Sequence, residues 1–141
     1  MRNLSKRATR GAFTLVELLV VVVLIAVLAS IAIPKFMNSG LRSREAALRA
    51  DLKLYRNAVE LFTNDCGASP ATLADLTATT APVSGLDPAA GVKTINAADW
   101  NGPYLYALVP DPISTTAFDY SVTAGSVGVV TSSAGAPYSG W

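Results

Sequence analysis

A single carboxylate inside a long apolar run is the first group of this 141-residue chain that suggests chemistry. Only Thr14, Glu17 and Ser30 interrupt the apolar side chains between Phe13 and Ile33. A charged side chain in the hydrocarbon core of a membrane costs a few kcal/mol or more and needs a partner. The apolar run itself offers Glu17 no evident partner. We therefore expect the neutralising charge to come from another copy of the same chain.

The apolar run is long enough to cross a membrane as a helix. Residues 13–33 number 21, and at about 1.5 Å per residue they reach about 31 Å. Backbone groups in lipid must be satisfied within the segment, which favours a helix. The preceding leader carries four bases, Arg2, Lys6, Arg7 and Arg10, and no acid. The positive-inside rule then predicts a cytoplasmic N-terminus and an exported C-terminal part.

Two ordinary interpretations of this segment compete with assembly. A cleaved secretory signal would place a small-residue cleavage site after the apolar run, and residues 29–32, Ala-Ser-Ile-Ala, are a weak match. A plain signal anchor would leave the helix in the membrane. Neither interpretation explains the glutamate at the fifth position of the apolar segment.

The start of the run resembles a known processing signal. Residues 11–17, Gly-Ala-Phe-Thr-Leu-Val-Glu, followed by the aliphatic run, resemble the class III signal of type IV pilins and of the pseudopilins of type II secretion. The resemblance implies that a prepilin peptidase removes the basic leader on the cytoplasmic side. The apolar helix then stays on the mature subunit, whose first residue is commonly N-methylated. Pro34 lies where the family usually has a helix-kinking proline.

The cleavage position has two possible placements. The family's leader usually ends in a glycine directly before the phenylalanine, whereas Ala12 lies between Gly11 and Phe13 here. A cut after Ala12 makes Phe13 the first residue and Glu17 the fifth, as in the family. A cut after Gly11 shifts that spacing by one residue. We expect the cut after Ala12, with an N-methylated Phe13, because it preserves the spacing.

The resemblance also implies a partner for Glu17. In a homopolymer, Glu17 of one subunit would pair with the Phe13 amine of its neighbour, which neutralises two buried charges and sets the axial register. The other implied partners are an inner-membrane assembly platform and a cytoplasmic ATPase. The precursor would span the inner membrane once. The mature chain would enter an extracellular filament or a periplasmic pseudopilus.

The expected fold is α+β, a pilin fold with a long kinked N-terminal helix packed on a small antiparallel sheet of about three strands. We expect a cleaved leader at 1–12, a transmembrane and filament-core helix at 13–34, an amphipathic stem helix at 35–63 and a globular head at 64–141. Pro34 removes one helical hydrogen bond, which predicts a kink or a local melt between about residues 26 and 34.

The stem carries apolar residues at helical spacing, namely Leu41, Leu48, Leu52, Tyr55, Val59 and Phe62. The head must cover this stripe. Residues 64–67, Asn-Asp-Cys-Gly, predict the end of the helix. Cys66 is the single cysteine, and we expect a small buried residue rather than a reactive thiol.

The head sequence predicts a short helix, then a loop, then a sheet. Ser69 is the expected N-cap with Pro70 at the first helical position, and this helix would end near Leu76. Residues 77–103 have no steady period and predict an irregular loop. Alternating side chains predict strands within about 104–131, at 104–109, 118–123 and 127–131. The tail at 132–141 either docks or hangs free.

Part of the head resembles the major pseudopilins. The matching residues are Trp100-Asn-Gly-Pro-Tyr-Leu105, Pro110-Asp111-Pro112 and Phe118-Asp119-Tyr120. In that family a calcium ion pins a loop here, so Asp111 and Asp119 are the calcium candidates that the resemblance implies. The family's later Asp-Gly element is missing, and two carboxylates are few for the roughly six to eight oxygens around calcium. Ordinary turn aspartates and no cofactor are the alternative.

The composition argues against an enzyme. The chain has no histidine, which excludes Ser-His-Asp and Cys-His catalysis and histidine zinc sites. A lone cysteine forms no intrachain disulfide. The sequence carries no Walker loop, dinucleotide fingerprint or clustered acid pair.

Charge is distributed unevenly along the chain, although the net charge is only +1. The stem carries Lys35, Arg42, Arg44, Arg49, Lys53 and Arg56 against Glu45 and Asp51, which sums to +4. From residue 57 onward Lys93 opposes Glu60, Asp65, Asp75, Asp87, Asp99, Asp111 and Asp119, which sums to −6. These are either two solvated faces or surfaces that meet in a fibre. The acidic head argues against nucleic acid binding.

The sequence therefore points to a structural subunit. Our first hypothesis is a pilin that polymerises into a type IV pilus for adhesion, twitching motility or DNA uptake. The alternative is a major pseudopilin of a type II secretion system, and the incomplete calcium element favours the pilus. A non-polymerising single-span protein with an exported binding head leaves the Phe13–Glu17 spacing unexplained.

Overall fold

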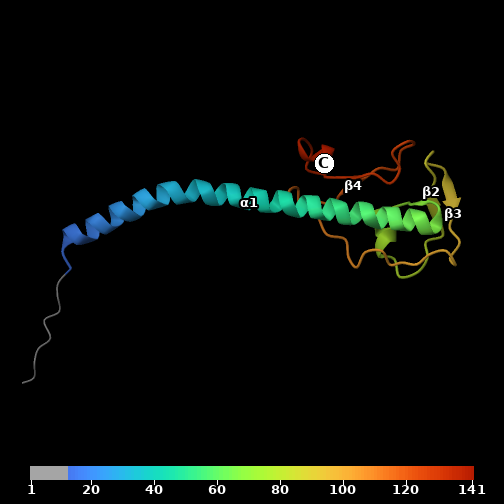
Figure 1. Cartoon of the computed structure of the whole chain (residues 1–141), viewed down its shortest axis with the longest axis horizontal. Helices are drawn as coiled ribbons and strands as arrows, with labels where there is room; N and C mark the ends of the chain where they lie inside the picture. The colour runs from blue at the N-terminus through green and yellow to red at the C-terminus, as the bar shows by residue number, and fades with distance from the viewer. Residues whose placement is uncertain (1–12) are drawn as a thin grey trace, which may run out of the picture. The chain divides into compact units, whose positions relative to one another are not determined.

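The protein, seen in a computed structural model that describes residues 13–141, divides into two compact units, Met1–Gly40 and Leu41–Trp141. Helix α1 (Leu15–Cys66) runs through both units and is the only α-helix in the described range (Figure 1). All the strands of the described range belong to the second unit.

The N-terminal part of α1 is an unbroken helix through Pro34. The expected local melt between residues 26 and 34 is therefore wrong, while a kink at Pro34 stays a prediction. Proline lacks an N–H and removes one bond of the ladder, the one to the carbonyl of Ser30. The other bonds of the aliphatic run maintain the helix. The Ser30 hydroxyl donates to the Val27 carbonyl at 2.7 Å.

The C-terminal part of α1 buries the predicted apolar stripe. Its buried members are Leu48, Leu52, Tyr55, Val59 and Phe62. Leu41 is the exception and stays 49% exposed at the first residue of its unit. The helix ends at Cys66 as the sequence predicts, because Gly67 adopts φ +63° and donates its N–H to the Thr63 carbonyl at 2.8 Å.

A three-stranded antiparallel sheet follows the helix. Strands β1 (Ser69–Pro70), β2 (Ser84–Leu86) and β3 (Val92–Thr94) pair in the order β1-β2-β3. The registers pair Ser69 with Leu86 and Leu86 with Val92. The small antiparallel sheet of the expected fold class is thus confirmed, but it lies earlier in the chain than predicted.

Two local predictions about residues 69–103 are wrong. Ser69 enters strand β1 instead of capping a helix, and the 3-10 helix η1 (Leu73–Thr77) begins after Thr72, whose N–H donates to Asp75 at 2.8 Å. Residues 77–103 hold β2 and β3 rather than a wholly irregular loop. The Asp87 carboxylate closes their turn by accepting the N–H of Gly91 at 2.7 Å.

The predicted strand at 104–109 is absent from the structure. Its backbone finds other partners: the N–H groups of Tyr104 and Leu105 both donate to the Leu76 carbonyl at 2.9 Å. At Val109 the Tyr55 hydroxyl donates to the carbonyl at 2.9 Å and accepts the N–H at 2.7 Å. A side chain of α1 therefore replaces a neighbouring strand.

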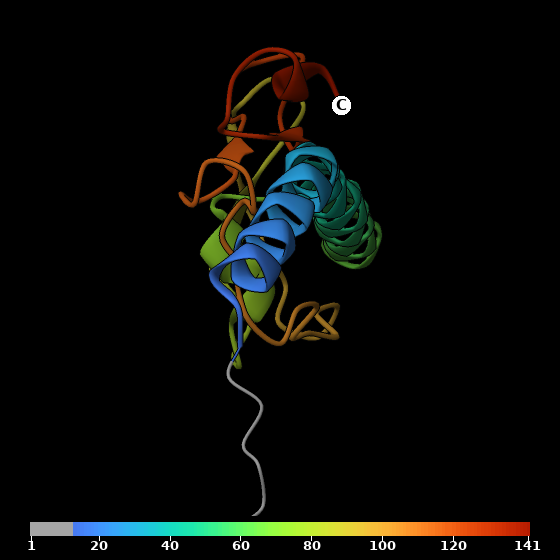
Figure 2. The same cartoon turned by 90° about the vertical axis from the view of Figure 1, so that its left-hand side faces the viewer.

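The other two predicted strands exist in shortened form. Strand β4 (Asp119–Tyr120) pairs antiparallel with β5 (Val130–Thr131), which makes a separate two-stranded sheet. Figure 2 shows the segments that follow Gly67 gathered on one side of α1. They supply Leu76, Ile95, Leu105, Phe118 and Val130 to the core that covers the helix stripe.

Candidate functional site

The N-terminal end of α1 brings Thr14 and Glu17 into contact. The Thr14 N–H and hydroxyl both donate to Oε2 of Glu17 at 2.9 Å. The Glu17 N–H in turn donates to the Thr14 hydroxyl oxygen at 3.2 Å. This reciprocal arrangement is a capping box, in which Thr14 is the N-cap of α1 and Glu17 is the third helical residue.

The capping box corrects the expectation that the apolar run holds no partner for Glu17. The sequence analysis missed Thr14 as the helix cap, although the spacing Thr-x-x-Glu before an apolar run is the signature of such a cap. Its N–H and hydroxyl are neutral donors, so they solvate the carboxylate without cancelling its charge. The demand for a cation in an apolar environment therefore remains.

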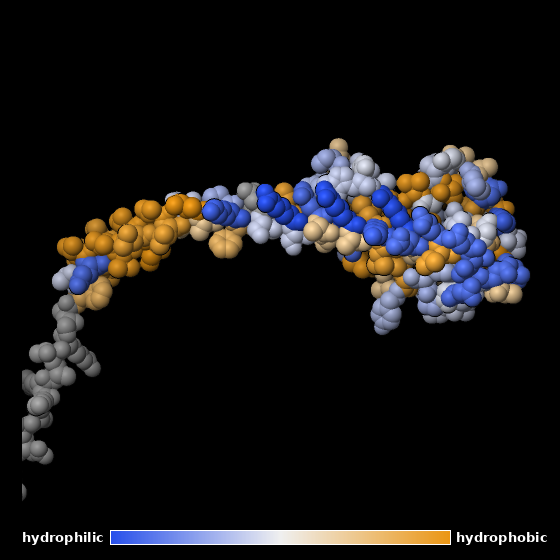
Figure 3. Space-filling view, in the orientation of Figure 1, coloured by the Kyte–Doolittle hydropathy of each residue, from blue (hydrophilic) through white to orange (hydrophobic). Residues whose placement is uncertain are grey.

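The helix around Glu17 exposes its apolar side chains on all sides. Phe13 is 74% exposed, and the most apolar 18-residue window of α1 has a mean hydropathy of 3.1 with none of it buried. Figure 3 shows this part of α1 covered by hydrophobic residues. Burying a Val, Leu or Ile side chain gains about 1.5–3 kcal/mol. By length and composition α1 is the one helix of the described range able to cross a membrane.

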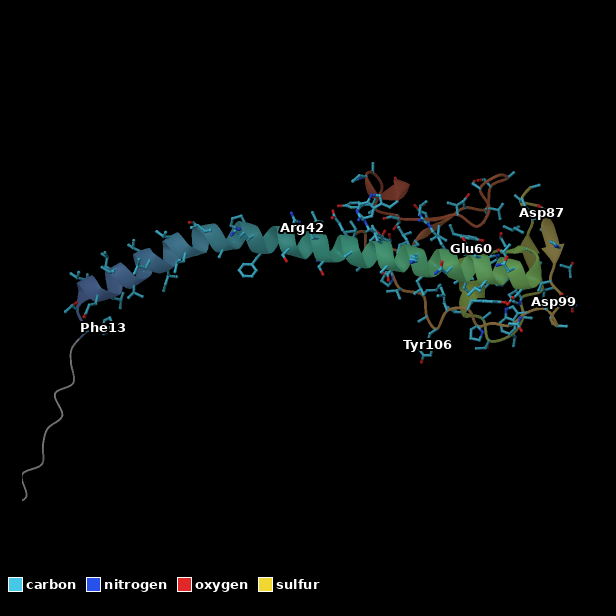
Figure 4. All side chains as sticks on the ribbon, viewed as in Figure 1. Phe13, Arg42, Glu60, Asp87, Asp99 and Tyr106 are labelled. Atoms are coloured by element: carbon cyan, nitrogen blue, oxygen red, sulfur yellow. The ribbon has the colours of Figure 1, made fainter. Side chains whose placement is uncertain are left out.

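The processing residues lie at the edge of the described range. Phe13 is described and precedes the first turn of α1 (Figure 4). Gly11 and Ala12 lie outside the described residues, so the cut after Ala12 and the cut after Gly11 both stay predictions.

The two calcium candidates lie in different environments. Asp111 is fully buried, and its carboxylate accepts the N–H groups of Ile113 and Ser114 and the hydroxyl of Ser132. Asp119 is exposed on strand β4. Among residues 13–141 no group of three or more Asp, Glu, Cys or His side chains is placed to hold a metal ion. The donors around Asp111 do not fit a calcium site.

The burial of Cys66 agrees with the expectation of a small core residue. The side chain belongs to the core cluster, and its thiol is free. Burial raises the pKa of the Cys66 thiol, which a hydrogen bond with Tyr104 partly offsets. A thiol with a raised pKa is a poor nucleophile at neutral pH.

The tail docks on the stem, which settles the alternative that the sequence left open. The Tyr138 hydroxyl donates to Glu45 at 3.1 Å, and the Arg49 guanidinium lies 4.2 Å from the centre of the Trp141 ring. Arg56 donates to the carbonyls of Val130, at 3.0 Å, and Trp141. Two of the stem arginines thus serve contacts within the chain.

Two comparisons with known proteins find a match, one at the N-terminal helix and one along most of the chain. The family model of the prokaryotic N-terminal methylation motif matches residues 7–33. The chain is also 26% identical over 107 residues to the type II secretion system core protein G of Pseudomonas aeruginosa, an alignment that covers 72% of this chain and 75% of that protein. No solved structure matches the chain significantly.

The methylation motif and the likeness to core protein G support the type IV pilin and pseudopilin family. Members of this family are structural subunits rather than enzymes. The methylation motif and the apolar helix fit a membrane-anchored precursor. The similarity to protein G extends well beyond the motif, because 107 aligned residues include much of the head.

Proposed function

We propose that this pilin-like chain is a structural subunit that polymerises into a type IV pilus filament at the cell surface. One observation carries the proposal: the charged Glu17 lies at the start of an otherwise apolar, uncovered helix, inside a methylation motif. Prepilin peptidase cuts after Ala12. The freed Phe13 amine of a neighbouring subunit then gives Glu17 the opposite charge that Thr14 does not supply.

Assembly removes the apolar helices from lipid and packs them against one another in the filament core. The precursor spans the inner membrane once with its basic leader in the cytoplasm. In this proposal an inner-membrane assembly platform and a cytoplasmic ATPase drive the transfer.

The second candidate is a major pseudopilin of a type II secretion system. It is favoured by the likeness to core protein G, whose name places that protein in such a system. Both candidates use the same Glu17 chemistry and differ in where the filament is displayed and what it moves.

Electron microscopy of material sheared from the cell surface, with mass spectrometry of its N-terminus, tests the proposal. We expect fibres whose subunit begins at N-methylated Phe13. A chain that still begins at Met1, or that is monomeric in detergent with no fibres, contradicts it. Deleting the gene separates the two candidates: loss of surface fibres with normal protein secretion indicates a pilus, and loss of secretion indicates a pseudopilus.

A further inference from the structure

Asp111 is a buried acid that neither the membrane helix nor the assembly chemistry uses. Its side chain is 0% exposed. Oδ1 accepts the N–H of Ile113 at 2.7 Å and the N–H of Ser114 at 3.2 Å, while Oδ2 accepts the hydroxyl of Ser132. Both oxygens of the buried carboxylate therefore have protein donors, as a buried charge requires.

These bonds join two segments that are distant in sequence. The loop at 111–116 closes on itself, because the Asp111 N–H donates to the Thr116 carbonyl at 2.8 Å. Ser132 follows strand β5, and its oxygen also accepts the N–H of Ala134 at 3.1 Å. Next to it, the hydroxyl of Ser133 lies 2.6 Å from that of Ser114. The loop is thus tied to the start of the tail.

The chemistry of this network excludes a cation at Asp111. N–H and O–H donors direct positive partial charge toward the carboxylate, whereas calcium needs about six to eight oxygens that direct lone pairs toward it. The other candidate, Asp119, is exposed and cannot complete the shell alone. Asp51 of α1 lies close enough for the negative charge of Asp111 to act on it. Burial, and then that charge, raise the pKa of the Asp51 carboxyl.

We infer that the Asp111 carboxylate, closed by Ser132 and the loop N–H groups, holds the end of the head in place where related pseudopilins use calcium, so that this head folds and assembles without metal. The inference does not depend on whether the filament is a pilus or a pseudopilus.

Thermal unfolding of the full mature chain in detergent micelles tests the inference. The fluorescence of Trp100 and Trp141, which both pack against the core of the head, follows unfolding, and Tm is measured in EGTA and in millimolar calcium chloride. We expect the two Tm values to agree within about 1 °C. A rise of about 5 °C or more in calcium would overturn the inference, because a ligand that binds the folded state raises its stability. This comparison needs no variant to fold.

The variant Ser132→Ala tests the hydrogen bond itself. We expect Tm to fall by about 5–15 °C in EGTA and in calcium alike, because a buried charge loses a donor. Asp119→Asn is the matched control and should leave Tm unchanged. An unchanged Tm for Ser132→Ala, or a decrease confined to Asp119→Asn, would contradict the inference. For assembly, the readout is filament yield, and we expect the yield in EGTA to equal the yield in calcium.

Discussion

Glu17, at the start of α1, takes part in two interactions that can be separated by substitution. Glu17 caps its own helix through Thr14, and in the proposed filament it also meets the Phe13 amine of a neighbour. The cap needs an acceptor oxygen, whereas the intersubunit pair needs a negative charge. Substitutions that remove only one of these properties distinguish the two tasks.

Thr14→Ala removes the cap and keeps the charge. An N-cap threonine contributes about 0.5–2 kcal/mol to its helix, so we expect faster amide hydrogen exchange in the first turn of α1. We expect filament yield to stay within about twofold of the parent, because the loss is confined to one turn and the Glu17 charge, on which the proposed assembly depends, is retained. A loss of filaments as complete as that caused by removing the Glu17 charge would show that the cap, and not the charge, controls assembly.

Asp51 gives a prediction with a pH dependence. Burial raises its pKa, and the nearby Asp111 charge raises it further, so the charged form is disfavoured in the folded head. A raised folded pKa costs stability that appears as pH rises above the unfolded value of about 3.9. Asp51→Asn should therefore raise Tm by a few degrees at pH 7, and the gain should vanish near pH 3. Equal gains at both pH values would contradict this assignment.

At the scale of elements, one tyrosine organises an irregular segment of the head. Residues 106–110 are exposed and lie outside any strand, yet Val109 exchanges two hydrogen bonds with the Tyr55 hydroxyl. The Tyr55 ring also packs against Phe118, with ring centres 4.9 Å apart. The hydroxyl therefore fixes the segment to α1, and the ring holds Tyr55 itself in the core.

Tyr55→Phe keeps the ring and removes both hydrogen bonds. We expect a loss of about 1–3 kcal/mol in unfolding free energy, because two hydrogen bonds to Val109, each worth about 0.5–1.5 kcal/mol, are lost. Limited proteolysis within 106–110 should become faster. Tyr106→Phe is the control, since its side chain is fully exposed and should change neither quantity. Similar proteolysis rates for the two variants would contradict the role of Tyr55.

The sequence predicts those elements that depend on residues close together in the chain. The stem stripe and the helix end at Gly67 follow from spacing and backbone preference within a few residues. The strand predicted at 104–109 fails because its hydrogen-bond partner is a side chain 54 positions away. Strands β2 and β3 are three residues each and too short for a period, although the Asp87–Gly91 turn marks their hairpin.

The candidate site residues follow the same rule: those that interact with near neighbours in the chain can be predicted, and those that interact with distant residues cannot. Glu17 stands out from composition alone, and the Thr14 cap is present in the sequence as a four-residue motif. The environment of Asp111 depends on Ser132, which lies 21 positions away, and no local pattern predicts that contact. A sequence resemblance therefore suggests a calcium ligand where the structure shows a carboxylate closed by hydrogen bonds.

At the scale of the whole molecule, charge is segregated within the second unit. Arg42 lies at the stem end, whereas Asp87 and Asp99 lie at the opposite end of the same unit (Figure 4). Arg49 and Arg56 are engaged by the tail. The stem charges available to another subunit are therefore the four remaining exposed bases, Lys35, Arg42, Arg44 and Lys53.

Filaments should therefore loosen at high salt. Exposed charge pairs act over a Debye length of about 10 Å at 0.1 M salt and only about 3 Å at 1 M. We expect the fraction of subunits that sediment as filaments to fall across this range, and a chain with Arg42→Gln and Arg44→Gln to lose most of that dependence. A salt response unchanged in the double variant would show that these stem charges do not contact neighbouring heads.

The central claim, that assembly needs the charge of Glu17, is tested most directly by the yield of sheared filaments from the variant Glu17→Gln. Glutamine keeps an oxygen that can accept from Thr14, so the helix cap and membrane insertion should match those of the parent chain. It removes the charge that the Phe13 amine of a neighbour requires, and we expect filament yield to fall at least about tenfold. Parental filament yield from this variant would contradict the claim.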